Sequence, residues 1–191
     1  MRELPSLVTR IAERSAATSQ PLVVALDGRS GVGKSTWAKA LATQLDATLI
    51  EGDDFFAGGV EVRRDRPQER AAACIDWQSQ RKVLSELRAG RAASYQAFDW
   101  LAFDGRLRVE ATRCEARRVV LLEGVYSARP ELRDLLDLRI LLRVPEAVRQ
   151  ARLLAREGVL TAWELQWHEA EQWYFAEAAP PECFDIVLDA D

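Results

Sequence analysis

The feature that most constrains this chain is one glycine-rich segment near its start. Residues 28–35 read GRSGVGKS and satisfy the pattern GxxxxGK[ST]. A continuous apolar run, Leu22–Leu26, precedes the segment and is typical of a buried strand. The stretch Thr36–Leu45 follows it with apolar residues at helical spacing. A loop of this composition between a strand and a helix predicts a cradle of backbone amides for phosphate groups.

The rest of the chain alternates the same two patterns. Besides Leu22–Leu26, buried strands are predicted at Thr48–Ile50, Val119–Leu122, Leu138–Val144 and Phe184–Leu188. Helical patterns occupy residues 4–11, Gln78–Leu87, Glu131–Leu136, 145–156 with Pro145 in the first turn, and 161–177. Such alternation predicts an α/β fold of three layers, a five-stranded parallel sheet with helices on both faces. No repeat or long linker divides the 191 residues, so we expect one domain, 1–191, with a small lid at about 150–165.

Composition excludes several other classes of protein. The 26 basic and 30 acidic residues give a formal net charge of −4, whereas nucleic-acid binding favours a basic excess. No apolar run approaches the roughly 18 residues that would cross a bilayer. The three cysteines are odd in number and form no CxxC pair, which is typical of reduced thiols. We therefore predict a cytoplasmic protein, a monomer or homodimer, without nucleic-acid or membrane partners.

Each residue type in the glycine-rich loop suits phosphate binding. Glycines let the backbone approach phosphate oxygens where a Cβ would obstruct it. Lys34 would bring a mobile positive charge to the β- and γ-phosphates, and the Ser35 hydroxyl would reach Mg²⁺. We therefore expect the chain to use ATP and Mg²⁺. The predicted nucleotide-binding residues are Gly28, Ser30, Gly31, Val32, Gly33, Lys34, Ser35 and Thr36.

This loop occurs in several classes of nucleotide-binding protein, and other segments distinguish them. A switch GTPase would carry an NKxD-like guanine-reading segment, which the sequence lacks. A motor or transporter ATPase would need a longer chain to couple hydrolysis to motion. A small-molecule kinase is the remaining class, and its acceptor would be a small hydroxyl compound.

Three further segments carry a resemblance to a known family. They read IEGDDFF at Ile50–Phe56, VVLLEGVY at Val119–Tyr126 and ARLLAREG at Ala151–Gly158. In this order, and together with the glycine-rich loop, they resemble the uridine kinase and nicotinamide riboside kinase group of P-loop nucleoside kinases. The resemblance spans roughly Leu22 to Asp189. It implies an ATP- and Mg²⁺-dependent kinase, most simply one that phosphorylates the 5′-hydroxyl of a nucleoside.

The resemblance also implies roles for individual residues. Asp53 matches the general base that contacts the acceptor hydroxyl, and Phe56 matches an aromatic residue of the acceptor pocket. Glu123 matches the carboxylate on the metal side, so that Ser35 and Glu123 would hold Mg²⁺. Arg152 and Arg156 match lid arginines, which with Lys34 would stabilise the transferring phosphate. Capping of a turn by Asp53 and solvated positions for the arginines are the structural alternatives.

The acceptor side departs from the uridine kinase pattern. Asp76 matches the ribose-binding acid, yet the base-side histidine is absent and Trp100 lies in its neighbourhood. Two Asp-Trp pairs, Asp76-Trp77 and Asp99-Trp100, indicate either a polar ring stacked on indole or a cation held by a carboxylate and a π-face. We predict that Asp76, Trp77 and Trp100 converge near Asp53, with tryptophans that merely pack a subdomain as the alternative. The single histidine, His168, is expected to be a surface or hydrogen-bonded residue of a helix, with a catalytic role as the alternative.

Three functions therefore stay open. The first is a nucleoside kinase, and the second is a kinase on the same scaffold for a sugar, a vitamin precursor or a hydroxylated antibiotic. The third is a regulatory module that binds a nucleotide without an acceptor. A base such as Asp53 would be superfluous in that module.

Overall fold

The computed structural model describes residues 2–190, and its centre is one parallel sheet. The strands lie in the order β2-β5-β1-β6-β7, and every neighbouring pair is parallel. The predicted α/β fold with a five-stranded parallel sheet is confirmed. The strands are β1 (Leu22–Asp27), β2 (Thr48–Glu51), β5 (Val119–Glu123), β6 (Leu138–Arg143) and β7 (Ile186–Asp189).

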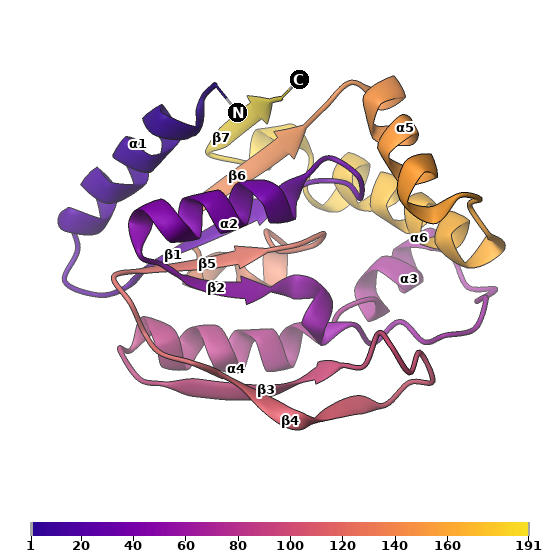
Figure 1. The fold of residues 1–191 in the computed structure, drawn as a ribbon, viewed down its shortest axis with the longest axis horizontal. Helices are drawn as coiled ribbons and strands as arrows, with labels where there is room; N and C mark the ends of the chain where they lie inside the picture. Colours follow the sequence, from indigo (N-terminus) through magenta and orange to yellow (C-terminus); the bar gives the residue numbers. More distant parts are fainter. Residues whose placement is uncertain (1, 191) are drawn as a thin grey trace.

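Helices cover both faces of this sheet. The α-helices are α1 (Leu4–Ala16), α2 (Lys34–Leu45), α3 (Pro67–Ala73), α4 (Trp77–Arg88), α5 (Glu146–Glu157) and α6 (Ala162–Trp173). Short 3₁₀ turns are η1 (Gly52–Phe55), η2 (Pro130–Leu135) and η4 (Pro181–Cys183), and a π-helical turn η3 (Tyr174–Ala178) extends α6. Figure 1 shows α1 and α2 on one side of the sheet, α4 on the other, and α3, α5 and α6 at the end toward which the strands point.

The alternation of side chains along β1 explains the two helical layers. Leu22, Val24 and Leu26 pack in the core beneath α1 and α2, whereas Val23 and Ala25 pack in the core on the α4 side. Successive strand residues point to opposite faces, so a strand covered on both faces must be apolar throughout. All six residues of β1 are buried. The central strand therefore has no solvent-facing side, which is why it appears in the sequence as a continuous run.

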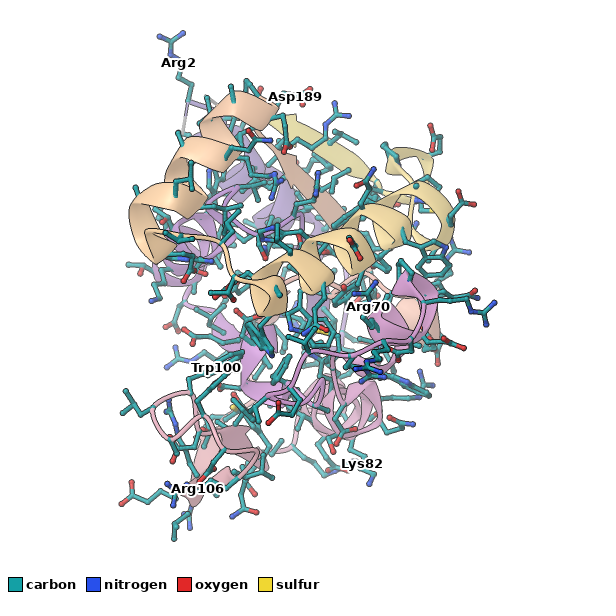
Figure 2. All side chains as sticks on the ribbon, turned by 90° about the vertical axis from the view of Figure 1, so that its right-hand side faces the viewer. Arg2, Arg70, Lys82, Trp100, Arg106 and Asp189 are labelled. Atoms are coloured by element: carbon teal, nitrogen blue, oxygen red, sulfur yellow. The ribbon has the colours of Figure 1, made fainter. Side chains whose placement is uncertain are left out.

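The sequence-based prediction lacks a two-stranded hairpin and one helix. Strands β3 (Ala93–Phe98) and β4 (Leu107–Cys114) form an antiparallel hairpin outside the main sheet, and α3 precedes α4. Apolar and polar residues alternate over the first six positions of β4, but most of the strand is exposed on both faces, so the pattern does not correspond to a buried face. Figure 2 shows Arg106 at the outer end of this hairpin and Trp100 where the hairpin approaches the body of the molecule.

The boundaries of the predicted helices shift by small amounts. Pro145 is the N-cap of α5 and not a residue of its first turn, because its ψ of 138° is extended and the helix begins at Glu146. Thr161 caps α6, and Glu164 completes a capping box with it. Over the described residues, no helix combines the length and apolar character needed to cross a membrane.

Candidate active site

The glycine-rich loop connects the carboxyl end of β1 to the first residue of α2. Its glycines have positive φ, and two of them are also constrained by packing. A Cβ on Gly28 would lie 2.4 Å from the Leu142 carbonyl oxygen, and one on Gly31 would lie 2.9 Å from Leu153 Cγ. Neither position admits another residue without displacing β6 or α5. The loop geometry therefore depends on glycine, as the motif predicts.

Positively charged side chains bind the carbonyl oxygens of this loop. Lys34 Nζ donates to the Arg29 oxygen at 3.2 Å, and from α5 Arg149 donates to the Ser30 oxygen at 3.2 Å. Arg152 Nη1 donates to the Val32 oxygen at 3.1 Å. The first amides of α2 have no acceptor within their own helix and carry the positive end of its dipole. The arrangement suits an anion placed against the start of α2.

A buried carboxylate beneath the loop, Asp27, does not appear among the sequence-based predictions. It is fully buried and accepts hydrogen bonds from three backbone amides, those of Gly28, Tyr126 and Ala128. The Tyr174 hydroxyl donates to Asp27 Oδ2 at 2.9 Å. Burial raises the pKa of Asp27 to about 6, although these donors oppose the shift. Asp27 thereby joins the end of β1 to the segment that follows β5.

Ser35, at the start of α2, contacts Glu123, the last residue of β5. Ser35 Oγ donates to Glu123 Oε1 at 3.1 Å, because β5 lies beside β1 and ends at the start of α2. Burial raises the pKa of Glu123 to about 7, while the positive charge of Lys34 lowers it. A carboxylate and a hydroxyl are oxygen ligands of the kind that Mg²⁺ takes, together with phosphate oxygens and water. The two predicted metal ligands are thus adjacent.

Asp53 lies in η1, directly after β2. Its side chain is exposed to a cavity that protein atoms surround, and the loss of bulk water there raises its pKa. The positive charge of Lys34 opposes that shift and Glu171 adds to it. A carboxylate with raised proton affinity beside a phosphate cradle suits a general base. Asp54 differs, because its Oδ2 accepts a hydrogen bond from the Tyr95 hydroxyl at 2.8 Å.

The cavity beside Asp53 has a volume of about 760 Å³. It extends from Ser30 of the glycine-rich loop to η1, the β3–β4 hairpin and α6. Phe56, Trp100 and Arg156 line it, as the sequence predicts for acceptor and lid residues. Trp100 Nε1 donates to the Asp53 carbonyl oxygen at 3.1 Å, so the hairpin is hydrogen-bonded to η1. Arg156 forms an ion pair with the adjacent Glu157.

The structure brings Asp76 next to η1, where its amide donates to the Phe55 oxygen at 2.8 Å, but it does not bring Asp76 and Trp77 into the cavity with Trp100. Neither Asp76 nor Trp77 lines the cavity. Asp76 caps α4, where its carboxylate accepts from the Ser79 amide at 3.0 Å and from the Ser79 hydroxyl. The Arg129 guanidinium lies over the indole of Trp77, 5.7 Å from the ring centroid. Asp76 and Trp77, which the sequence predicts as acceptor contacts, are the N-cap and the first residue of α4.

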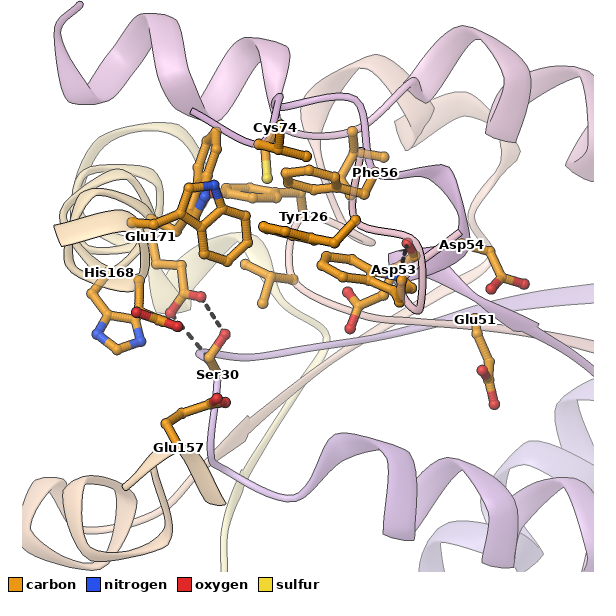
Figure 3. A pocket seen from close by; sticks show the side chains of 18 of the residues that line it. Ser30, Glu51, Asp53, Asp54, Phe56, Cys74, Tyr126, Glu157, His168 and Glu171 are labelled. Atoms are coloured by element: carbon orange, nitrogen blue, oxygen red, sulfur yellow. Dashed lines mark hydrogen bonds between the residues drawn. The ribbon is translucent and has the colours of Figure 1, made fainter. Parts of the chain in front are cut away.

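Helix α6 contributes residues that sequence reasoning did not assign to the site. Trp163, Trp167 and Glu171 follow one another at intervals of four and line the cavity together with Glu164 and His168. Glu171 is 3% exposed; it accepts the Ser30 amide at 3.0 Å and also the Ser30 hydroxyl. Figure 3 shows these two bonds between Glu171 and the loop. His168 is half-buried on α6 and lies in the cavity wall, and burial lowers its pKa.

Comparison with known proteins agrees with this geometry. Residues 23–174 match the family model described as AAA domain. The chain belongs to this AAA domain family. Membership and the loop together imply nucleotide binding by this AAA domain.

Curated relatives of this AAA domain are distant and longer. It is 25% identical over 128 residues to uridine-cytidine kinase C of Dictyostelium discoideum, a match that covers 66% of this chain and 28% of that protein. It is 27% identical over 153 residues to a uridine kinase of Limosilactobacillus reuteri, over 73% of this chain and 66% of that protein. The chain thus spans less than two thirds of the length of these relatives. An inorganic pyrophosphatase of Arabidopsis thaliana also matches, at 26% identity over 122 residues, 62% of this chain and 18% of that protein.

The fold of this AAA domain also occurs among solved structures. A putative fructose transport system kinase from Silicibacter sp. TM1040 superposes with a TM-score of 0.74 at 24% identity, over 97% of this chain and 98% of that one. A possible uridine kinase from Bacillus stearothermophilus gives a TM-score of 0.69 at 19% identity, over 98% of this chain and 100% of that one. At these identities the likeness establishes the fold, which kinases with different acceptors share.

Proposed function

We propose that this chain is a kinase that transfers the γ-phosphoryl group of ATP to a hydroxyl of a small molecule. The observation that carries the proposal is the position of Asp53, which lines a cavity of about 760 Å³ that also reaches Ser30 of the glycine-rich loop. A protein that only binds a nucleotide needs no carboxylate base facing a second cavity. The same feature argues against a pyrophosphatase, whose acceptor is water.

Asp53 would accept the proton of the acceptor hydroxyl as the new O–P bond forms and the bond to the leaving ADP breaks. Lys34 would shift from the Arg29 carbonyl oxygen to the phosphates. Arg152 and Arg156 would close over the transferring group, with residues of about 150–165 as a lid that excludes water. Positioning by these groups is the main work of a phosphoryl-transfer site.

Ser35 and Glu123 are the residues that would hold Mg²⁺. Their oxygen atoms lie 3.1 Å apart at the start of α2. No group of three acidic, histidine or cysteine side chains in residues 2–190 forms a metal site by itself. This fits an ion that enters with the nucleotide and is completed by phosphate oxygens and water. Mg²⁺ would supply positive charge where the phosphate oxygens accumulate negative charge.

The site constrains the identity of the acceptor less than it constrains the type of reaction. A nucleoside 5′-hydroxyl is supported by the sequence resemblance to uridine kinases, and we retain a cytoplasmic monomer or homodimer. However, the prediction of a nucleoside depended partly on Asp76 as a ribose contact, and Asp76 caps α4 instead. This favours the second candidate, a non-nucleoside hydroxyl compound.

The test is ADP release from ATP and Mg²⁺ with nucleosides, sugars, amino sugars and amino alcohols as acceptors. We expect release above the basal rate with at least one of them. Asp53→Asn should lower kcat by about 100-fold, on the scale of losing general-base catalysis, while the Kd for ATP changes little. Asp54→Asn is the matched control, because Asp54 is bound to Tyr95. Equal loss in both variants, or ADP release that no acceptor stimulates, would argue against this function.

A further inference from the structure

The residues that line the acceptor cavity carry more negative than positive charges. Among the described residues that line it, six carry a carboxylate, against two guanidinium groups and one imidazole. The carboxylates belong to Glu51, Asp53, Asp54, Glu157, Glu164 and Glu171. Burial lowers the pKa of His168, so the imidazole does not offset them near neutral pH. Lys34, Arg149 and Arg152 do not line the cavity and bind loop carbonyls instead.

Three of these carboxylates are already bound by a neighbouring group of the protein. Asp54 accepts from Tyr95, Glu157 pairs with Arg156, and Glu164 caps α6. Asp53 has the proposed role of base. Glu171 differs because it is almost fully buried and yet faces the cavity, with Ser30 as its hydrogen-bond donor and the Arg29 guanidinium at 3.9 Å. A carboxylate has room for more donors than these, so Glu171 can bind a ligand cation as well.

Besides carboxylates, aromatic rings line the cavity. Phe56 is in contact with Trp100, Trp163 and Trp167, with ring centroids 5.0, 5.8 and 5.6 Å apart. Phe103 lies 5.1 Å from Trp163 and stacks on Trp100 at 6.2 Å. We call these five rings the aromatic wall. Trp163 and Trp167 share the face of α6 that carries Glu171, so the wall adjoins the buried carboxylate.

Two buried polar atoms of residues that line the cavity lack a hydrogen-bond partner within the described residues. They are Trp167 Nε1 and Tyr126 Oη, on side chains that are 7% and 2% exposed. Buried donors are rarely left unpaired, because the loss of water costs about 1–3 kcal/mol for each group. Both residues line the cavity, and Tyr126 is seen there in Figure 3. Neither atom has appreciable accessible surface, so both lie behind the cavity wall and do not face the cavity in this structure.

We propose that the acceptor is a hydroxylated ammonium compound, an amino alcohol or amino sugar whose positive nitrogen lies between Glu171 and the aromatic wall. This inference rests on the proposed kinase function. A carboxylate beside indole faces binds ammonium groups by charge and by cation–π attraction, and excludes anions. The acceptor hydroxyl then reaches Asp53, which lines the same cavity.

The experiment compares pairs that differ in charge and hardly in shape. Choline is paired with 3,3-dimethylbutan-1-ol, its neutral isostere, and glucosamine with glucose. We expect the cation of at least one pair to exceed its neutral partner at least tenfold in kcat/KM, or in affinity by calorimetry where turnover is too slow. Glu171→Gln should reduce this ratio toward one. Because Glu171 also accepts hydrogen bonds from Ser30 of the glycine-rich loop, the comparison is the cation-to-neutral ratio within the variant, measured at saturating ATP.

Glu169→Gln is the matched control on the same helix. Glu169 is exposed, pairs with the buried Arg70 and does not line the cavity, so its variant should keep the preference for the cation. Equal or better use of the neutral partners would overturn the inference and leave the kinase function intact, as would nucleosides as the preferred acceptors. Absence of both binding and turnover for the two cations would overturn it as well. Failure of the kinase function is a separate result, in which no acceptor of any class stimulates ADP release.

Discussion

At the scale of single residues, the sequence identified groups that belong to a motif and missed groups that do not. Lys34 and Ser35 were predicted from the GxxxxGK[ST] motif, and the resemblance to a kinase family implied the roles of Asp53 and Glu123 at two strand ends. Asp27 was not, although it is fully buried beneath the loop. An acid at the end of an apolar run indicates nothing about its donors, and those of Asp27 come from Gly28 and from two distant segments.

Asp27 gives a prediction about pH. Its pKa of about 6 in the folded protein exceeds the value of 3.8 for a free carboxyl, so the native state binds this proton more tightly than the unfolded chain. The stability that Asp27 contributes is therefore present below about pH 4 and is lost as pH rises through 6, by up to about 3 kcal/mol. Asp27→Asn does not titrate. We expect the unfolding free energy of the wild type minus that of Asp27→Asn to fall between pH 4 and pH 7.5 in urea titrations.

Tyr174→Phe serves as the control, because it removes one donor from Asp27 but keeps the carboxyl. Its stability should retain the pH dependence of the wild type or increase it. A difference between wild type and Asp27→Asn that grows with pH would mean that the four donors outweigh burial.

At the scale of elements, the contact between the glycine-rich loop and α5 joins the phosphate cradle to the proposed lid. Arg149 and Arg152 bind loop carbonyls from α5, and Leu153 packs against Gly31. The sequence predicted both partners as separate elements. It could not show that they touch, because the contact joins residues about 120 positions apart.

Gly31→Ala tests this contact. The φ of Gly31 is 86°, and a Cβ there would lie 2.9 Å from Leu153 Cγ. Gly105 has a similar φ of 92° in the β3–β4 hairpin, with open space around it, so Gly105→Ala carries the backbone strain alone. We expect Gly31→Ala to cost about 1–3 kcal/mol more than Gly105→Ala in chemical unfolding, and to weaken ATP binding where Gly105→Ala does not. Equal costs would show that α5 moves away freely.

At the scale of the whole molecule, two apolar cores lie on opposite faces of one sheet. Ile11 of α1 and Leu84 of α4 are fully buried in different cores. Because β1 contributes side chains to both, we expect the cores to unfold together. Ile11→Ala and Leu84→Ala should each lower the unfolding free energy by about 2–5 kcal/mol and keep one transition by fluorescence and circular dichroism. Two separate transitions in either variant would contradict a single domain over residues 1–191.

The sequence by itself determined the central sheet, the phosphate cradle and the residues of the proposed chemistry. These features depend on local pattern, since a strand buried on both faces is continuously apolar and a phosphate loop needs glycine at set positions. Only the tertiary structure decided what surrounds Asp53. Asp76 and Trp77 do not line the cavity. Glu171, Trp163 and Trp167 of α6 line it together with residues of the loop and the hairpin. The reason is physical: an acid or an indole has the same local preference in a helix cap, a surface or a binding site, and long-range packing alone selects among them.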